Sequence, residues 1–150
     1  MDKTDIKDLL AEDLPFQSYD KVRYGDTDRQ GHVNNAIFAE YLETGRVEML
    51  YQFKHLVKGE IPNFVTAAID LDLLAEIKWP GTVEIASGIT KIGNSSIRFY
   101  QVLSQSGKVV GKAQSVLVCV GKKTGKAQSL TAEFKLALKP YLIKIKPVCG

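Results

Sequence analysis

The sequence contains few of the residues that cross-link or anchor a chain. It has two cysteines, Cys119 and Cys149, and two histidines in 150 residues. This is too little for a disulfide framework, and it makes no zinc-binding pattern. No apolar run approaches the ~18 residues that cross a membrane. The acidic start "MDKTDIKDLLAEDL" is unlike a signal or transit peptide. We therefore expect a cytoplasmic protein with no bound metal and no membrane span.

A surplus of charge is missing as well. A net charge of +3 tolerates an anionic ligand, but the lysines do not alternate with aromatic residues as a base-stacking surface requires. We expect no nucleic-acid partner. The composition, 45% hydrophobic and 25% charged, is ordinary for one globular domain. We expect a single domain over residues 1–150, with an N-terminal arm at 1–15 and a C-terminal tail at 132–150.

Two common catalytic motifs are approached but not met. "GKKTGKA" has three residues between its glycines, and Ala127 replaces the Ser or Thr of a phosphate-binding loop. "GNSSI" lacks the second glycine of a nucleophile elbow, and both histidines precede it. These departures exclude a nucleotide-binding loop and weaken a serine-hydrolase interpretation.

What is present is one helical pattern followed by strands. From Asn34 onward, apolar residues recur at steps of three and four, which predicts a helix that ends near Lys54 to Gly59. Asn34 or Asn35 is suited to the N-cap. Gly45 lies in mid-helix, where glycine costs up to ~1 kcal/mol. We expect it to mark a close approach of the helix to a sheet.

Strand patterns precede and follow this helix. Phe16 to Asp26 predicts a first strand, and Asn63 to Ile77 begins as a strand with an ambiguous second half. Residues 82–92, 97–104 and 109–121 alternate or are mostly apolar, and short turns such as "WPG" and "GNSS" separate them. Such short connections favour antiparallel neighbours. The order predicts an α+β fold in which one helix packs on an antiparallel sheet of about five strands.

Polar residues crowd the segment before the helix: Asp26, Asp28, Gln30, His32, Asn34 and Asn35. One interpretation is that they solvate a loop and cap the helix. A cap, however, needs one residue, and a helix N-terminus offers free N–H groups that suit a polarised carbonyl or oxyanion. A nearby carboxylate could serve as base or nucleophile on that carbonyl. The second interpretation is therefore a reaction site.

The stretch "YGDTDRQGHVNNAIFAEYLETGR" resembles the signature of the hotdog-fold acyl-CoA thioesterases, in particular the 4-hydroxybenzoyl-CoA thioesterase-like family. The resemblance covers roughly residues 16–130. It implies a hotdog fold, in which an antiparallel sheet wraps one long central helix. It also implies hydrolysis of an acyl thioester to free acid and CoA, with coenzyme A as part of the substrate and no separate cofactor.

The same resemblance assigns roles to residues. Asp28 matches the catalytic aspartate, as base or nucleophile, and Asp26 matches a first acid to which we assign a loop-structuring role. Plant acyl-carrier-protein thioesterases are similar too, with an aspartate, an asparagine and a histidine at alternating positions. Here these positions read Asp28, Gln30 and His32, so glutamine replaces asparagine. In the benzoyl type a proline commonly follows the aspartate, whereas here Arg29 does.

The resemblance further implies that backbone N–H groups from Gly31 to Asn35 polarise the thioester oxygen. His32 orients Asp28 or a water, or bonds the substrate. The substrate-binding residues it implies are Tyr24, Gln30, Gly31, Asn34, Asn35, Ser95 and Ser96. Phe38, Tyr41 and Leu42 line an acyl tunnel or belong to the core. The site lies between two subunits of a homodimer or homotetramer, and Ser95 and Ser96 approach the opposing site.

Other functions stay open. The carrier of the acyl group is CoA or an acyl carrier protein, in a biosynthetic pathway. A hotdog binding module that holds an acyl thioester without cutting it is a second option. A hotdog dehydratase or hydratase is a third, although the order "DTDRQGH" fits it less well.

Overall fold

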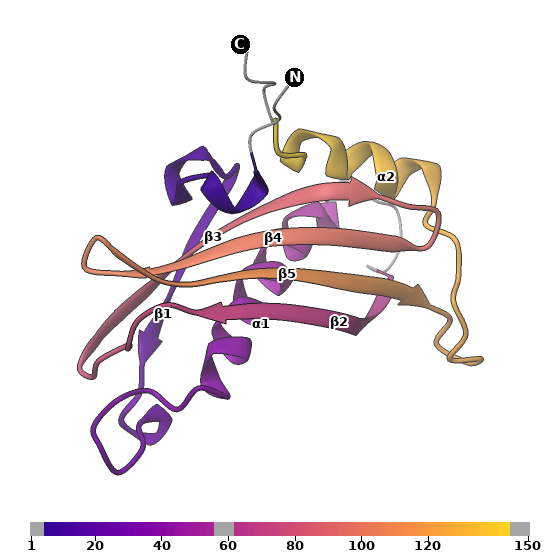
Figure 1. Cartoon of the computed structure of the whole chain (residues 1–150). Helices are drawn as coiled ribbons and strands as arrows, with labels where there is room; N and C mark the ends of the chain where they lie inside the picture. The colour runs from indigo at the N-terminus through magenta and orange to yellow at the C-terminus, as the bar shows by residue number, and fades with distance from the viewer. Residues whose placement is uncertain (1–4, 56–61, 145–150) are drawn as a thin grey trace, which may run out of the picture.

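The structure is a computed structural model that describes residues 5–55 and 62–144. Its sheet has five strands, β1 (Phe16–Val22), β2 (Asn63–Leu73), β3 (Gly81–Ile92), β4 (Ser96–Gln105) and β5 (Lys108–Val120). The strand order is β1-β3-β4-β5-β2, and every neighbouring pair is antiparallel. The predicted α+β class and the five-stranded antiparallel sheet are confirmed (Figure 1).

The first predicted strand is too long at its C-terminal end, and the ambiguous second half of the next one is strand only as far as Leu73. β1 stops at Val22, and Tyr24–Asp26 form a 3-10 turn instead. The cause is Asp26: its Oδ2 accepts from the Arg23 N–H at 3.0 Å, while its own N–H donates to the Arg23 carbonyl at 3.0 Å. β2 stops at Leu73, so residues 74–77 leave the sheet edge. In both cases the residues after the strand leave the sheet and lead toward the polar loop that precedes α1.

Helix α1 (Ile37–Tyr51) packs on one face of the sheet, mainly against β3 and β1. A Cβ on Gly45 would lie 2.5 Å from Ile85 Cγ2 and 2.9 Å from Gln101 Nε2. Because real Cβ atoms do not come so close, the predicted close approach at Gly45 is confirmed. A 3-10 turn, Gln52–His55, follows α1, so the helix ends before the predicted range. Residues 56–59 of that range lie outside the described residues.

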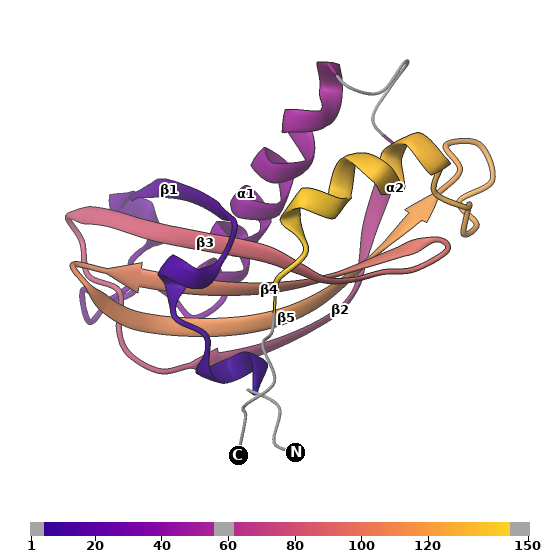
Figure 2. The ribbon, with the colours of Figure 1, turned by 90° about the horizontal axis from the view of Figure 1, so that it is seen from above.

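The sheet is covered on both faces, as Figure 2 shows. On one face, α1 and α2 (Ala132–Leu138) cover two apolar clusters; α2 contributes Phe134 and Leu138. On the other face, two 3-10 turns, Ile6–Asp8 and Ala11–Asp13, lie over Tyr100 and Val102. The division into arm, domain and tail stays a prediction. None of the helices in the described part of the chain has the length and apolar character needed to cross a membrane.

Candidate active site

The polar segment before α1 forms a closed loop. Thr27 pairs with Val33 across it. The Asp28 N–H donates to the His32 carbonyl at 2.8 Å, and the Gly31 N–H donates to the Asp28 carbonyl at 3.2 Å. Gly31 has a φ of +83°, a conformation that side chains disfavour, so glycine suits this corner. The loop therefore has a defined shape rather than being only a solvated connection.

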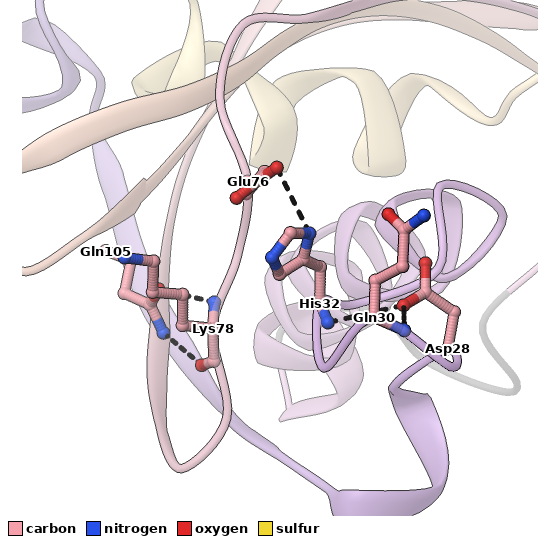
Figure 3. Close-up of polar contacts among 6 residues, drawn as sticks. All are labelled: Asp28, Gln30, His32, Glu76, Lys78 and Gln105. Carbon is pink, nitrogen blue, oxygen red and sulfur yellow. Dashed lines mark hydrogen bonds and ion pairs between the residues drawn. The ribbon is translucent and has the colours of Figure 1, made fainter.

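Within this loop the Asp28 carboxylate is held on one side. Its Oδ1 accepts from the Gln30 N–H at 2.9 Å and from the His32 N–H at 3.3 Å (Figure 3). Its Oδ2 has no hydrogen bond to the described part of the chain, and Asp28 is exposed. One oxygen thus anchors the carboxylate, and the other is available to a water or a substrate.

Asp28 stands beside a hollow of about 360 Å³. This size falls in the range of small-molecule sites. Polar side chains line one part of the hollow and apolar ones the rest: Asp28, Gln30, His32, Asn35 and Glu76, with Val33, Phe38, Leu73, Leu74 and Ala75. We call it the Asp28 hollow. The structure thus brings four of the predicted polar residues to one place.

The His32 ring is directed toward Glu76, as Figure 3 shows. Nδ1 lies 3.1 Å from Glu76 Oε1, so the carboxylate supports a proton on Nδ1 and leaves Nε2 for a water or substrate. The hydrogen bonds between His32 and Asp28 come from the His32 backbone, whose N–H and carbonyl both bond Asp28, whereas the His32 ring bonds Glu76. The histidine is therefore oriented by a residue outside the loop.

A second contact positions the segment that carries Glu76. The Gln105 side chain receives the Lys78 N–H on Oε1 and donates from Nε2 to the Lys78 carbonyl, both at 2.8 Å (Figure 3). Lys78 in turn forms a backbone bridge with His32. We call the closed loop of residues 27–33 the Asp28 loop. These contacts connect it to the end of β4 and to the segment after β2.

The backbone amides predicted to polarise the substrate are largely occupied. From Gly31 to Asn34, the N–H groups donate to the Asp28 carbonyl, the Asp28 carboxylate, the Ile77 carbonyl and the Asp26 carbonyl. The Asn35 N–H donates to no acceptor in the described part of the chain, and Asn35 lines the hollow. Of the five predicted donors, Asn35 is the one that can meet a ligand.

Asn34 caps the turn before the helix rather than the helix itself. Its Oδ1 accepts from the Ala36 N–H at 3.1 Å and its carbonyl from the Ile37 N–H at 2.9 Å. Ala36 occupies the N-cap of α1 and has no side chain that can cap it. The prediction of Asn34 or Asn35 at that position is wrong, because an extra turn separates the loop from α1.

The contacts of Asp26 hold the turn after β1 against α1. Asp26 is 8% exposed and its Oδ2 accepts from the Tyr41 hydroxyl at 2.7 Å as well as from Arg23. Burial, and then this hydrogen bond, raise the pKa of Tyr41 well above its ordinary value. Phe38, Tyr41 and Leu42 are all buried in the core, and of these Phe38 also lines the Asp28 hollow.

Three predicted substrate-binding residues lie away from the Asp28 hollow of their own chain. Tyr24 is 72% exposed and packs edge to face on Trp79, with ring centroids 5.1 Å apart. It belongs to neither the core nor this hollow. Ser95 and Ser96 stand at the turn between β3 and β4, at the other end of the sheet from Lys78. Their predicted role concerns a second copy of the chain, and it stays a prediction.

Sequence reasoning missed Glu76, Lys78 and Gln105. Glu76 stands in "LLAEI", where a lone acid follows apolar residues. That signal marks a strand end but does not reveal contact with His32. The described residues contain no group of three or more His, Cys, Asp or Glu side chains placed to hold a metal ion.

The fold and the site together define a class: an α+β domain with a carboxylate loop that leads into its packing helix. The family model of the Thioesterase-like superfamily matches residues 22–138. The chain belongs to this superfamily, and the predicted thioester hydrolase family is confirmed.

Two named relatives and one solved structure are similar to this chain over most of its length. The long-chain acyl-CoA thioesterase FadM of Escherichia coli K12 is 30% identical over 129 residues, which cover 83% of this chain and 97% of FadM. The acyl-CoA thioester hydrolase YbgC of E. coli O6:H1 is 28% identical over 123 residues, 77% of this chain and 92% of YbgC. A thioesterase of Thermus thermophilus, solved with coenzyme A and Zn, has a TM-score of 0.73 at 27% identity. That likeness covers 84% of this chain and 98% of the other.

Proposed function

We propose that this protein hydrolyses acyl-CoA thioesters, with Asp28 as base or nucleophile. The observation that carries the proposal is the held Asp28 carboxylate: two backbone N–H groups fix Oδ1, Oδ2 has no hydrogen bond within the described part of the chain, and Asp28 lines a ligand-sized hollow. The names of FadM and YbgC support a CoA ester as substrate. In the predicted hotdog arrangement, α1 is the central helix that the sheet wraps.

Two routes lead to the same products. In the first, Asp28 takes a proton from a water whose oxygen forms the new bond to the thioester carbon; the C–S bond then breaks, and the thiolate receives the proton. In the second, an Asp28 oxygen attacks the carbon and expels the thiolate, and water then cleaves the resulting anhydride. Both routes release the free acid and CoA, and we propose that neither needs a cofactor.

The carbonyl oxygen gains negative charge in both routes. The Asn35 N–H, which is not used within the described part of the chain, is placed to donate to it at the start of the turn into α1. His32, held by Glu76, supplies a second donor or positions the water. Gln30 and Asn35 side chains bind the rest of the thioester.

A second hollow, of about 550 Å³, provides a place for the CoA moiety. It shares Leu74, Ala75 and Glu76 with the Asp28 hollow, and Lys78 and Lys108 stand in its lining. Two ammonium groups beside a reaction site suit the phosphates of CoA. We therefore assign Lys78 and Lys108 to phosphate binding.

The active form in this proposal is a homodimer, alone or paired into a tetramer. In the sheet that the described residues form, β2 is an edge strand beside β5, and Val65, Ile69 and Leu73 on it are exposed. An exposed apolar edge strand is a ready surface for pairing with another chain. This arrangement places Ser95 and Ser96 near the opposing site. We place the protein in the cytoplasm.

The test measures thiol release from a panel of acyl-CoA and acyl-carrier-protein esters, with wild type and Asp28→Asn. Wild type should release CoA, and the variant should release far less. Faster thiol release from carrier-protein esters would identify the acyl carrier protein, rather than CoA, as the carrier of the acyl group. Retained ester without turnover would identify a binding module instead. Hydration of an enoyl-CoA would favour the dehydratase class, and activity lost to a chelator would contradict the absence of a cofactor.

A further inference from the structure

A third hollow, of about 320 Å³, lies between the C-terminal half of α1 and β2. Its walls are largely apolar, with one cation and one acid among them: Glu43, Arg46, Val47, Leu50, Tyr51, Pro62, Phe64, Thr66 and Leu117. We call it the Arg46 hollow. It is at the opposite end of β2 from the Asp28 hollow, which Leu73 lines.

Arg46 is an unusual residue for an apolar wall because it is only 3% exposed. No carboxylate among the described residues forms an ion pair with it. Its Nη1 donates to Gln101 Oε1 at 3.1 Å. A guanidinium has five N–H donors, and burial of a charge without a paired anion is costly. Burial lowers the pKa of Arg46, and the nearby Glu43 charge opposes that effect.

A buried polar network holds this cation in place. Gln101 donates from Nε2 to the Leu42 carbonyl at 2.9 Å and to Ser87 Oγ at 3.0 Å, so its Oε1 is turned toward Arg46. Gln101 and Ser87 are fully buried, and the absence of a Cβ on Gly45 leaves room for both. This network in the core fixes the guanidinium at the hollow, as a binding group requires.

We propose that the Arg46 hollow binds a carboxylate at the far end of the substrate's acyl group, so that the enzyme prefers ω-carboxyacyl thioesters. A guanidinium presents paired N–H groups that match a carboxylate. The apolar walls receive the short methylene stem. The proposal rests on the thioesterase function proposed above, and it adds the chemical class of the acyl group.

The acyl group reaches this hollow from the active site of a second copy. When two copies pair antiparallel along their β2 edges, the Leu73 end of one strand lies beside the Phe64 end of the other. The Asp28 hollow of one copy then adjoins the Arg46 hollow of its neighbour. The reacting carbonyl and the distal carboxylate thus contact different copies of the chain.

The test compares glutaryl-CoA with the same ester whose terminal carboxylate is replaced by a carboxamide. Wild type should show a kcat/KM ratio of about tenfold or more in favour of the carboxylate, because a site built for a charged group rejects its neutral analogue. Arg46→Met should bring the ratio near one, and Arg46→Lys should retain part of it. Glu43→Gln should raise it by removing a competing charge.

Arg98 provides the matched control, since it is an exposed arginine on β4 outside the hollow. Arg98→Met should keep the wild-type ratio. A wild-type ratio near one, or a ratio unchanged in Arg46→Met, overturns the proposal. If Arg46→Met does not fold, unchanged ratios in Arg46→Lys and Glu43→Gln overturn it equally.

Failure of the thioesterase function has a different signature. If wild type cleaves neither ester, isothermal titration with both esters decides the matter. Tighter binding of glutaryl-CoA that Arg46→Lys weakens supports the carboxylate site while the hydrolysis fails. Cleavage of both esters at equal rates leaves the hydrolysis standing and removes the carboxylate site.

Discussion

His32 Nδ1 lies 3.1 Å from Glu76 Oε1, and this contact joins the Asp28 loop to the segment that follows β2. The backbone and the ring of the histidine therefore have different partners. The backbone N–H of His32 holds Asp28, while its ring is oriented by Glu76. Substitutions of the ring should therefore leave the Asp28 carboxylate in place and change how the substrate or water is bound.

Glu76→Gln should lower kcat/KM by weakening the orientation of the His32 ring. If Glu76 acts only through His32, the double variant Glu76→Gln, His32→Gln should cost no more than His32→Gln alone. The measurement is a double-mutant cycle on thioester hydrolysis, with thermal melting to check folding. Additive losses would show that Glu76 acts independently of the histidine.

Gly45→Ala should destabilise the protein by about 1–3 kcal/mol, because the added Cβ would lie 2.5 Å from Ile85 Cγ2. Alanine is the better helix former by up to ~1 kcal/mol, so propensity alone predicts the opposite sign. Gly25→Ala is the matched control, since nothing lies within 4 Å of its added Cβ. Denaturant unfolding of both variants measures the difference, and equal stabilities would contradict the packing argument.

Loss of the hydroxyl at two buried tyrosines should change the stability of the protein in opposite directions. The Tyr41 hydroxyl bonds Asp26 at 2.7 Å, whereas the buried Tyr100 hydroxyl has no partner in the described part of the chain. Tyr41→Phe should cost about 1–3 kcal/mol, and Tyr100→Phe should stabilise by about 1 kcal/mol. Thermal melting compares them; a lower melting temperature for Tyr100→Phe would be evidence against this assignment.

The pKa of Tyr100 predicts that the folded protein loses stability in alkali. Burial raises the pKa of Tyr100 from 10.0 to about 12. A raised pKa means that folding favours the neutral form of Tyr100. The contribution of Tyr100 to the free energy of unfolding is therefore fully present below pH 10 and is lost as the pH rises toward 12. Unfolding free energies measured across this window should fall for wild type and fall less for Tyr100→Phe.

The double variant Lys78→Gln, Lys108→Gln should raise KM for acyl-CoA about fivefold while kcat stays near wild type, since surface ion pairs contribute modestly. The control is the matching acyl-pantetheine, which lacks the nucleotide phosphates. Its KM should be the same for both proteins. An equal rise for both substrates would place the lysines elsewhere than at the CoA phosphates.

Much of the fold follows from local patterns. Period-two alternation along β3 and short turns predict antiparallel strands, and a glycine within the apolar face of α1 predicts its close approach to the sheet. Asp28, Gln30 and His32 were likewise predictable, since they crowd one short loop. The contact of His32 with Glu76 was not, because it depends on a pairing between distant segments. Arg46 was hidden for the same reason: its buried partner, Gln101, belongs to β4.

The most direct test of the proposed mechanism is kcat/KM of Asp28→Asn on the ester that wild type cleaves best. A group that transfers the proton contributes roughly 10²- to 10⁴-fold, so we expect a loss of that size with unchanged melting temperature. Asp8→Asn, an exposed acid in the N-terminal 3-10 turn, should hydrolyse the ester as wild type does. Equal hydrolysis by wild type and Asp28→Asn would contradict the role of Asp28.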